Sequence, residues 1–227
     1  IESFVAQITG GTAANGGSIY ALTAIDLTGA SVSGGKSTSN GGNIYSNQAV
    51  TIGENTVISG GTADNNGGNI YLTGMTAHLN MTAGTVTEGT AGNTGGNINA
   101  LNSANVKIEG GQITNGTAAS HGGNLYVTNQ LKDNKIVTTR RLVITGATIS
   151  GGSAGTEQIL GEDGTVIQES KIGNGGNIWV RAGQVSISGA TITEGSATGN
   201  GGNIYANQAQ LFDDDPETTA NEGGSLT

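Results

Sequence analysis

Several residue types are scarce in this chain of 227 residues, and each scarcity excludes a class of structure. Cysteine is absent, so no disulfide can form. Proline occurs once, at Pro216, and the helix formers Glu, Lys, Arg and Leu are few, whereas Thr, Ser, Asn, Ile and Val are plentiful. No apolar run is long enough to cross a bilayer. This balance favours short strands joined by tight turns.

Positive charge is also scarce. Eight Lys and Arg stand against 17 Asp and Glu, which gives a formal net charge of -9. Because phosphate backbones are bound by clustered cations, we expect no nucleic-acid partner. An anionic membrane surface is disfavoured for the same reason, and we predict no membrane insertion.

Glycine, in contrast, accounts for 42 residues, and it lacks the Gly-X-Y period of collagen. It recurs at the head of a five-residue box, typically Gly-Gly-Asn-Ile-Tyr. The boxes span residues 16–20, 41–45, 67–71, 95–99, 122–126, 175–179 and 201–205. Their first glycines are separated by 25, 26, 28, 27, 53 and 26 residues. A fixed period in the twenties, with one double step, is the signature of a solenoid.

Two further strand-like patterns lie between successive boxes. In the first, an apolar residue is followed directly by Thr or Ser, and a glycine stands two positions after that Thr or Ser. Its apolar column reads Ile8, Val32, Ile58, Val86, Ile113, Ile149 and Ile192. The second pattern alternates apolar and polar residues, as at Val50 and Ile52. Period-two alternation turns one face of each strand inward, and we interpret the glycines as corners that need positive φ.

These patterns predict an all-β fold, a right-handed parallel β-helix with three short strands per coil of about 26 residues and seven to eight coils. At about 4.8 Å per coil, the rod would be about 35–40 Å long. We assign residues 1–210 to the β-helix, with insertions at 127–141 and 155–174, and residues 211–227 to an acidic C-terminal segment that ends in a partial coil. In the second insertion, a turn signal between two apolar runs predicts a β-hairpin.

Two positions of the box are candidates for a functional role. The third position is a column of asparagines, which we interpret as a structural ladder because each amide can bond to the Asn above and below. Its members are Asn43, Asn69, Asn97, Asn124, Asn177 and Asn203. The fifth position holds the only Trp and all five Tyr, and it is interrupted at Asn99. Its members are Tyr20, Tyr45, Tyr71, Tyr126, Trp179 and Tyr205.

The aromatic column has two interpretations. If the box isoleucines point inward, the rings point outward, and an exposed stripe of rings can bind carbohydrate or dock a partner. Alternatively, the rings stack on one another as a packing ladder. The two insertions flank the column at Tyr126 and Trp179, and insertions in solenoids often line a binding face.

Other chemistry has less support in the sequence. His78 and His121 are isolated in different coils, and no carboxylate pair recurs beside a base. We therefore predict no catalytic residues, no metal ligands and no cofactor. The acidic run at 213–215 is interpreted as a solvated segment rather than as a Ca²⁺ site.

Ice binding is a less favoured alternative. Outward Thr pairs, such as Thr85 with Thr87, could order water on a flat solenoid face. The array is interrupted at Gln7, Val57 and Gln112.

The Gly-Gly-Asn-Ile-Tyr box, followed by turns of the Thr-Ile-Ser-Gly-Gly kind, resembles the repeats of bacterial surface β-helix proteins. It is similar to the Gly-Gly-Ala-Ile repeats of the polymorphic outer-membrane adhesins, and more broadly to pectate-lyase-like right-handed β-helices. The resemblance covers about residues 1–210 and implies the fold and a cell-surface location. The acidic Ca²⁺ ligands and the basic residue that lyases of this fold use have no counterpart here, so no catalytic residues carry over.

We expect a non-enzymatic extracellular structural protein, either a surface stalk or adhesin segment or a head-to-tail filament subunit. Ile1 aligns with a strand position and residues 223–226 resemble the box at 16–19, so the chain begins where its own end would continue. Ile1 and Leu226 would then mark end-to-end self-association or continuation in a longer chain. The alternative is a carbohydrate-binding β-helix, with or without polysaccharide-degrading activity, whose aromatic face takes a glycan or host-surface ligand.

Overall fold

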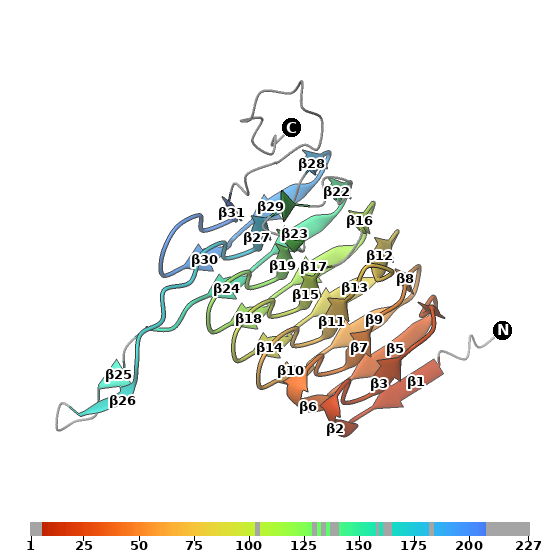
Figure 1. The fold of residues 1–227 in the computed structure, drawn as a ribbon, viewed down its shortest axis with the longest axis horizontal. Helices are drawn as coiled ribbons and strands as arrows, with labels where there is room; N and C mark the ends of the chain where they lie inside the picture. The colour runs from red at the N-terminus through yellow and green to blue at the C-terminus, as the bar shows by residue number, and fades with distance from the viewer. Residues whose placement is uncertain are drawn as a thin grey trace.

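The computed structural model describes residues 6–102, 105–128, 131–132, 135–136, 141–157, 159–160, 165–181 and 184–207. Within these ranges the chain forms strands and turns, and no helix there is long and apolar enough to cross a membrane. Almost all strands belong to four parallel sheets that wrap around one axis (Figure 1). The predicted all-β parallel β-helix is confirmed.

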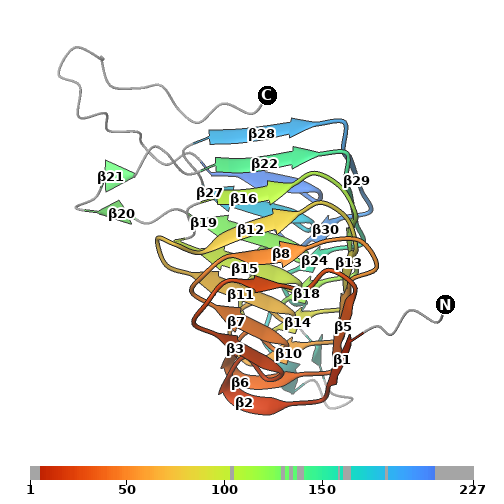
Figure 2. The ribbon, with the colours of Figure 1, turned by 90° about the vertical axis from the view of Figure 1, so that its right-hand side faces the viewer.

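Each of the three predicted strand patterns forms one sheet. The box sheet contains β3 (Ile19–Ala21), β7 (Ile44–Ser46), β11 (Ile70–Thr73), β15 (Ile98–Leu101), β19 (Leu125–Thr128), β27 (Ile178–Arg181) and β31 (Ile204–Ala206). The alternating sheet contains β4 (Ile25–Asp26), β8 (Val50–Ile52), β12 (His78–Met81), β16 (Asn105–Ile108), β22 (Arg141–Thr145) and β28 (Gln184–Ser188), and Figure 2 shows most of it as a stack. The Ser/Thr sheet contains β1 (Ala6–Thr9), β5 (Ala30–Ser33), β9 (Val57–Ser59), β13 (Thr85–Thr87), β17 (Gln112–Thr114), β23 (Thr148–Ser150) and β29 (Thr191–Thr193).

A fourth sheet, in which five of the seven strands have only two residues, was not predicted. It contains β2 (Thr12–Asn15), β6 (Lys36–Asn40), β10 (Thr62–Ala63), β14 (Thr90–Ala91), β18 (Thr117–Ala118), β24 (Ser153–Ala154) and β30 (Ser196–Ala197). The side chain that such a strand turns inward is a small one, Ala63 in β10 and Ser37 in β6. A strand of two residues with a small inward side chain leaves no apolar alternation in the sequence.

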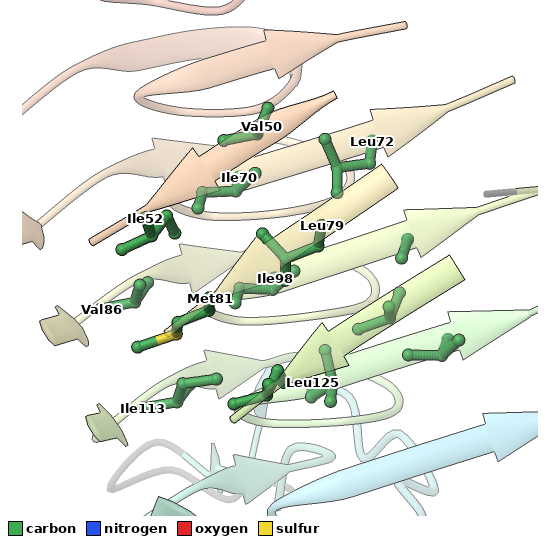
Figure 3. Close-up of a cluster of buried hydrophobic side chains, with 14 of the residues drawn as sticks. Val50, Ile52, Ile70, Leu72, Leu79, Met81, Val86, Ile98, Ile113 and Leu125 are labelled. Carbon is green, nitrogen blue, oxygen red and sulfur yellow. The ribbon is translucent and has the colours of Figure 1, made fainter. Parts of the chain in front are cut away.

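Equivalent residues of successive coils lie in register. In the box sheet Ile70 pairs with Ile44 on one side and with Ile98 on the other. All three side chains are fully buried, and Figure 3 shows Ile70, Ile98 and Leu125 one coil apart in the core. In the alternating sheet Leu79 and Met81 pair with Val50 and Ile52. The longer step from residue 67 to 95 therefore does not disturb the core.

The core is less well covered in the first and the last described coil. Ile8, Ile19 and Ile25 in the first coil are only partly buried, and so are Ile187, Ile192 and Ile204 in the last. Their equivalents in the interior coils are fully buried, because a neighbouring coil packs on each side of them. Both ends of the described rod thus present apolar side chains and unpaired strand edges.

Both predicted insertions contain an antiparallel strand pair. In the first, β20 (Leu131–Lys132) pairs with β21 (Lys135–Ile136), and β19 and β22 extend into the predicted boundaries of the insertion. In the second, β25 (Ile159–Leu160) pairs with β26 (Val166–Gln168), which confirms the hairpin there. The hairpins project from different corners of the rod (Figures 1 and 2). The predicted acidic segment 211–227 lies outside the described residues.

Candidate functional site

The asparagine column forms a continuous chain of hydrogen bonds through the rod. Each side-chain Nδ2 donates to the Oδ1 of the equivalent Asn in the next coil. The donor-to-acceptor distances are 2.7 Å for Asn43–Asn69, Asn69–Asn97, Asn97–Asn124 and Asn124–Asn177, and 2.8 Å for Asn177–Asn203. All members except Asn203, in the last described coil, are fully buried. We refer to this column as the inner ladder.

Each interior amide of the inner ladder is fully bonded. Asn97 Oδ1 accepts from Asn69 Nδ2 at 2.7 Å and from the Gly89 N–H at 2.8 Å. Its Nδ2 donates to Asn124 Oδ1 and to the Thr114 carbonyl, both at 2.7 Å. A buried amide with both donor hydrogens and two acceptor sites satisfied carries no desolvation penalty for an unmade bond. The third box position therefore requires the Asn side chain and not merely a polar one.

The inner ladder also explains why the second residue of the corner after each Ser/Thr strand is glycine in every coil, as at Gly61 and Gly89. A Cβ added at Gly89 would lie 2.2 Å from the Gly96 carbonyl oxygen and 2.8 Å from Asn69 Nδ2. Positive φ was predicted for these corner glycines. It is found one residue earlier in the chain, as at Gly60, where φ is 60°. At Gly61 and Gly89 the requirement is instead the close approach of backbone to the ladder.

A second ladder of side chains, which the sequence analysis missed, runs beside the first. It is formed by the residue that precedes each box, and we call it the outer amide ladder. Its members are Asn15, Asn40, Asn66, Thr94, His121, Asn174 and Asn200. Asn66 Nδ2 donates to Asn40 Oδ1 at 2.9 Å, and Asn200 Nδ2 donates to Asn174 Oδ1 at 3.2 Å. The signal was the recurrence of Asn at this position in five of the seven coils.

The two ladders have opposite polarity. In the inner ladder each Nδ2 donates toward the following coil, as from Asn43 to Asn69. In the outer amide ladder each Oδ1 accepts from the following coil, as at Asn15, which receives Asn40 Nδ2 at 3.3 Å. The rod thus has a direction at the level of side-chain hydrogen bonds as well as of strands.

The aromatic column consists mainly of rings stacked face to face. The ring centroids of Tyr20 and Tyr45 are 4.8 Å apart with an interplanar angle of 3°, and those of Tyr45 and Tyr71 are 5.4 Å apart. Beyond Asn99, Tyr126 and Trp179 stack at 4.4 Å, and Trp179 and Tyr205 at 6.4 Å. Since the interior rings turn their faces toward one another, the packing ladder is the interpretation that this geometry favours.

Exposure varies strongly along the aromatic column. Tyr71 and Trp179 are 7% exposed, whereas Tyr20 is 54% exposed. Burial raises the pKa of Tyr45, Tyr71 and Tyr126 above the ordinary value of tyrosine. For Tyr126 the positive charge of Arg181 opposes that shift in pKa. Among the described rings, Tyr20 offers the most open surface to a ligand.

Asn99, which interrupts the aromatic column, is hydrogen-bonded to Thr94, which replaces Asn in the outer amide ladder. Asn99 Nδ2 donates to Thr94 Oγ1 at 2.7 Å, and Thr94 Oγ1 donates to Asn66 Oδ1 at 2.7 Å. Asn99 is 2% exposed, and its Oδ1 has no hydrogen-bond partner among the described residues. Thr94 therefore satisfies the Asn99 Nδ2 donor but not the buried Asn99 Oδ1 acceptor.

His121 connects the outer amide ladder to the aromatic column. Its ring stacks on Trp179 with centroids 5.8 Å apart. Its Nδ1 accepts the backbone N–H of Asn174 at 3.1 Å, which requires the neutral ring. Burial lowers the pKa of His121, because the charged imidazolium is less well solvated there than in water.

The remaining predicted positions are placed as follows. Thr87 and Thr114 of the Ser/Thr sheet share a hydrogen bond between their hydroxyls at 2.9 Å. In the described part of the chain, no three His, Cys, Asp or Glu side chains are grouped closely enough to hold a metal ion. Ile1 and Leu226, the predicted assembly ends, lie outside the described residues.

No protein-family model, no curated protein and no solved structure matches the chain.

Proposed function

We propose that the chain is a non-enzymatic structural rod that works outside the cell, as part of a surface stalk or adhesin or as the subunit of a filament. A rod of this kind holds a fixed distance and resists unfolding and proteolysis. Both properties depend on how completely the coils bond to one another, because solenoid stability is a sum over coils and the contacts between neighbours.

The inner ladder is the observation that carries this proposal. Every coil-to-coil junction from Asn43 to Asn203 repeats the same amide bond at 2.7 to 2.8 Å, and all of these bonds except the last are buried. Hydrogen bonds in such a low-dielectric chain reinforce one another, so the ladder adds a second layer of order to the backbone sheets. A molecule that repeats identical junctions along its axis is suited to a structural role in which the length of the rod matters.

Surface labelling tests the proposal. An antibody raised against the purified rod should label intact cells of the organism that makes it, and brief treatment of those cells with protease should leave the rod largely intact. Labelling that appears only after the cells are permeabilised would contradict an extracellular role. The variant Asn97→Ala, which breaks the inner ladder, should become protease-sensitive, whereas Asn80→Ala, on the exposed side of β12, should not.

Carbohydrate binding is a second candidate function, and the open ring of Tyr20 is the observation that favours it. Sugars stack on ring faces, and the interior faces of the column are occupied by neighbouring rings. Tyr20→Ala should therefore abolish glycan-array signals while Trp179→Phe leaves them unchanged. Equal signals from the wild-type chain and Tyr20→Ala would count against this function.

A further inference from the structure

The opposite polarity of the two ladders gives the two ends of the described rod different hydrogen-bonding faces. At the C-terminal face, Asn203 Nδ2 is the donor and Asn200 Oδ1 the acceptor that interior coils use toward the following coil. Asn203 Oδ1 is already used by Asn177 Nδ2 and the Gly195 N–H. Asn200 Nδ2 is already used by Asn174 Oδ1. Within the described residues, Asn203 Nδ2 and Asn200 Oδ1 have no partner.

The N-terminal face carries the complementary groups. In the first coil Ser18 stands at the inner-ladder position, and its hydroxyl donates to Asn43 Oδ1 at 3.4 Å. A hydroxyl that donates in one direction keeps lone pairs that can accept from the other. Asn15 Oδ1 accepts from Asn40, and Asn15 Nδ2 is the group that in Asn40 and Asn66 donates to the preceding coil. The N-terminal face therefore offers an acceptor on the inner ladder and a donor on the outer one.

The same two faces expose matching apolar groups. Ile19 and Ile204 are equivalent box residues, and each is only partly buried. Tyr20 and Tyr205 are the outermost described rings of the aromatic column, and Tyr20 is 54% exposed. The strand edges at the two ends run in the same direction, since all strands within each of the four sheets are parallel. Each face is thus the surface that an interior coil presents to its neighbour.

We propose that the C-terminal face of one copy of this chain stacks on the N-terminal face of a second copy, as one further coil junction. Asn203 Nδ2 then donates to the Ser18 hydroxyl of the second copy, and Asn15 of that copy donates to Asn200 Oδ1. The interface continues the coil-to-coil contact that the chain already repeats between its own coils. This inference rests on the proposed structural role and identifies the chemistry by which copies join.

Polarity determines the orientation of the stack. Two N-terminal faces brought together would oppose donor to donor at Asn15 and would set parallel sheets against each other in the wrong direction. Head-to-tail contact is heterologous and does not close, so it extends into a filament.

A concentration series by analytical ultracentrifugation tests the junction. Wild-type chain should associate, whereas Asn203→Asp should need an about tenfold higher concentration, because the donor is lost and a charge is desolvated. Asn80→Asp makes the same change on an exposed side of the rod and should behave as wild type. The proposal is overturned if the wild-type chain stays monomeric throughout, or if the two variants associate equally.

A disulfide experiment fixes the orientation without depending on affinity. The chain has no cysteine, and paired residues of adjacent strands are close enough for a disulfide at about 4.8 Å. Tyr20→Cys and a size-tagged Tyr205→Cys, mixed in equal amounts and oxidised gently, should give mainly mixed dimers. Mixed dimers no more abundant than random collision produces would contradict head-to-tail stacking.

The two proposals can fail separately. A monomeric rod that labels the surface of intact cells and resists protease retains the structural role and loses only the junction. If the chain associates through Asn203 but is labelled only in permeabilised cells, the junction is supported and the extracellular role is contradicted.

Discussion

The inner ladder and the aromatic column lie two residues apart in the same boxes, yet they differ in which residue types they tolerate. Asn69 and Tyr71 bracket one inward residue of β11. The inner position is Asn in six of seven coils, with Ser18 in the first, whereas the aromatic position accepts Tyr, Trp and Asn. One column is nearly invariant along the rod and the other is not.

The difference lies in the directionality of the forces. An inner-ladder amide must meet two donors and two acceptors at fixed positions, and only Asn has the length and the groups to do so. A ring in the aromatic column contributes buried apolar area and a flat face for stacking, and side chains of several shapes can supply these at this position. Hydrogen-bond geometry therefore constrains a repeat more tightly than outward packing does.

Breaking the inner ladder in the middle of the rod should have the largest effect. Asn97→Ala removes four hydrogen bonds and leaves the Gly89 N–H, the Thr114 carbonyl and two neighbouring amides short of partners. We expect the free energy of unfolding to fall by about 4 kcal/mol, measured by urea denaturation. Asn80→Ala, on an exposed position, is the control and should change it little. A loss at Asn97 no greater than that at Asn80 would refute the importance of the ladder.

Crowding the inner ladder should have the next largest effect. In Gly61→Ala the new Cβ would lie 2.3 Å from the Gly68 carbonyl oxygen and 2.8 Å from two ladder amides, so the backbone must shift. We expect a loss of about 3 kcal/mol. The adjacent Gly60→Ala meets its nearest atom only at 4.0 Å, so positive φ alone opposes it, at about 1 kcal/mol. If the two variants melted together, close approach to the ladder would not be the constraint at Gly61.

Removing a ring from the aromatic column should cost less than removing an inner-ladder amide. Tyr45→Ala loses both stacking neighbours, Tyr20 and Tyr71, but leaves no buried polar group unpaired. We expect a loss of about 2 kcal/mol in the free energy of unfolding. Tyr45→Phe keeps the ring and should be close to wild type. A Tyr45→Ala chain as unstable as Asn97→Ala would erase the distinction between the two columns.

The features that were predicted from the sequence are ones that repeat in nearly every coil. The box spacing gave the period, the alternation of Val50 with Ile52 gave a strand, and the Asn column gave the inner ladder. These signals are visible because one physical requirement is repeated at each coil. The in-register pairing of Leu79 and Met81 with Val50 and Ile52 shows that the core pattern survives a change in coil length.

Features that depend on pairs of residues from different columns could not be predicted. The bond between Asn99 and Thr94 joins two exceptions that look unrelated in the sequence. The outer amide ladder was hidden because Thr94 and His121 interrupt its Asn pattern, although Thr94 still donates to Asn66 and His121 still accepts from Asn174. Short strands such as β10 show no apolar alternation, although Thr or Ser followed by Ala recurs at this position in six of the seven coils. The faces of the rings depend on side-chain geometry that spacing does not encode.

The smallest effect concerns His121, where the repeat's usual Asn is replaced by a group that titrates. Its neutral Nδ1 accepts the Asn174 N–H, and burial holds its pKa below the ordinary 6.5. Above that value the ring is neutral in the folded and the unfolded chain, so its contribution to stability is complete. As the pH falls below 6.5 the unfolded chain takes up a proton that the folded chain resists. The free energy of unfolding should therefore decline until the pH passes the lowered pKa.

The variant His121→Asn isolates this contribution, because Asn supplies an acceptor for the Asn174 N–H without a titrating group. Urea denaturation of both chains from about pH 7.5 to about pH 5 should give curves that diverge on the acidic side. Parallel curves would mean that His121 is a tolerated replacement with no pH response. Divergence would show that the outer amide ladder, although it accepts Thr and His in place of Asn, depends on an unprotonated acceptor at His121.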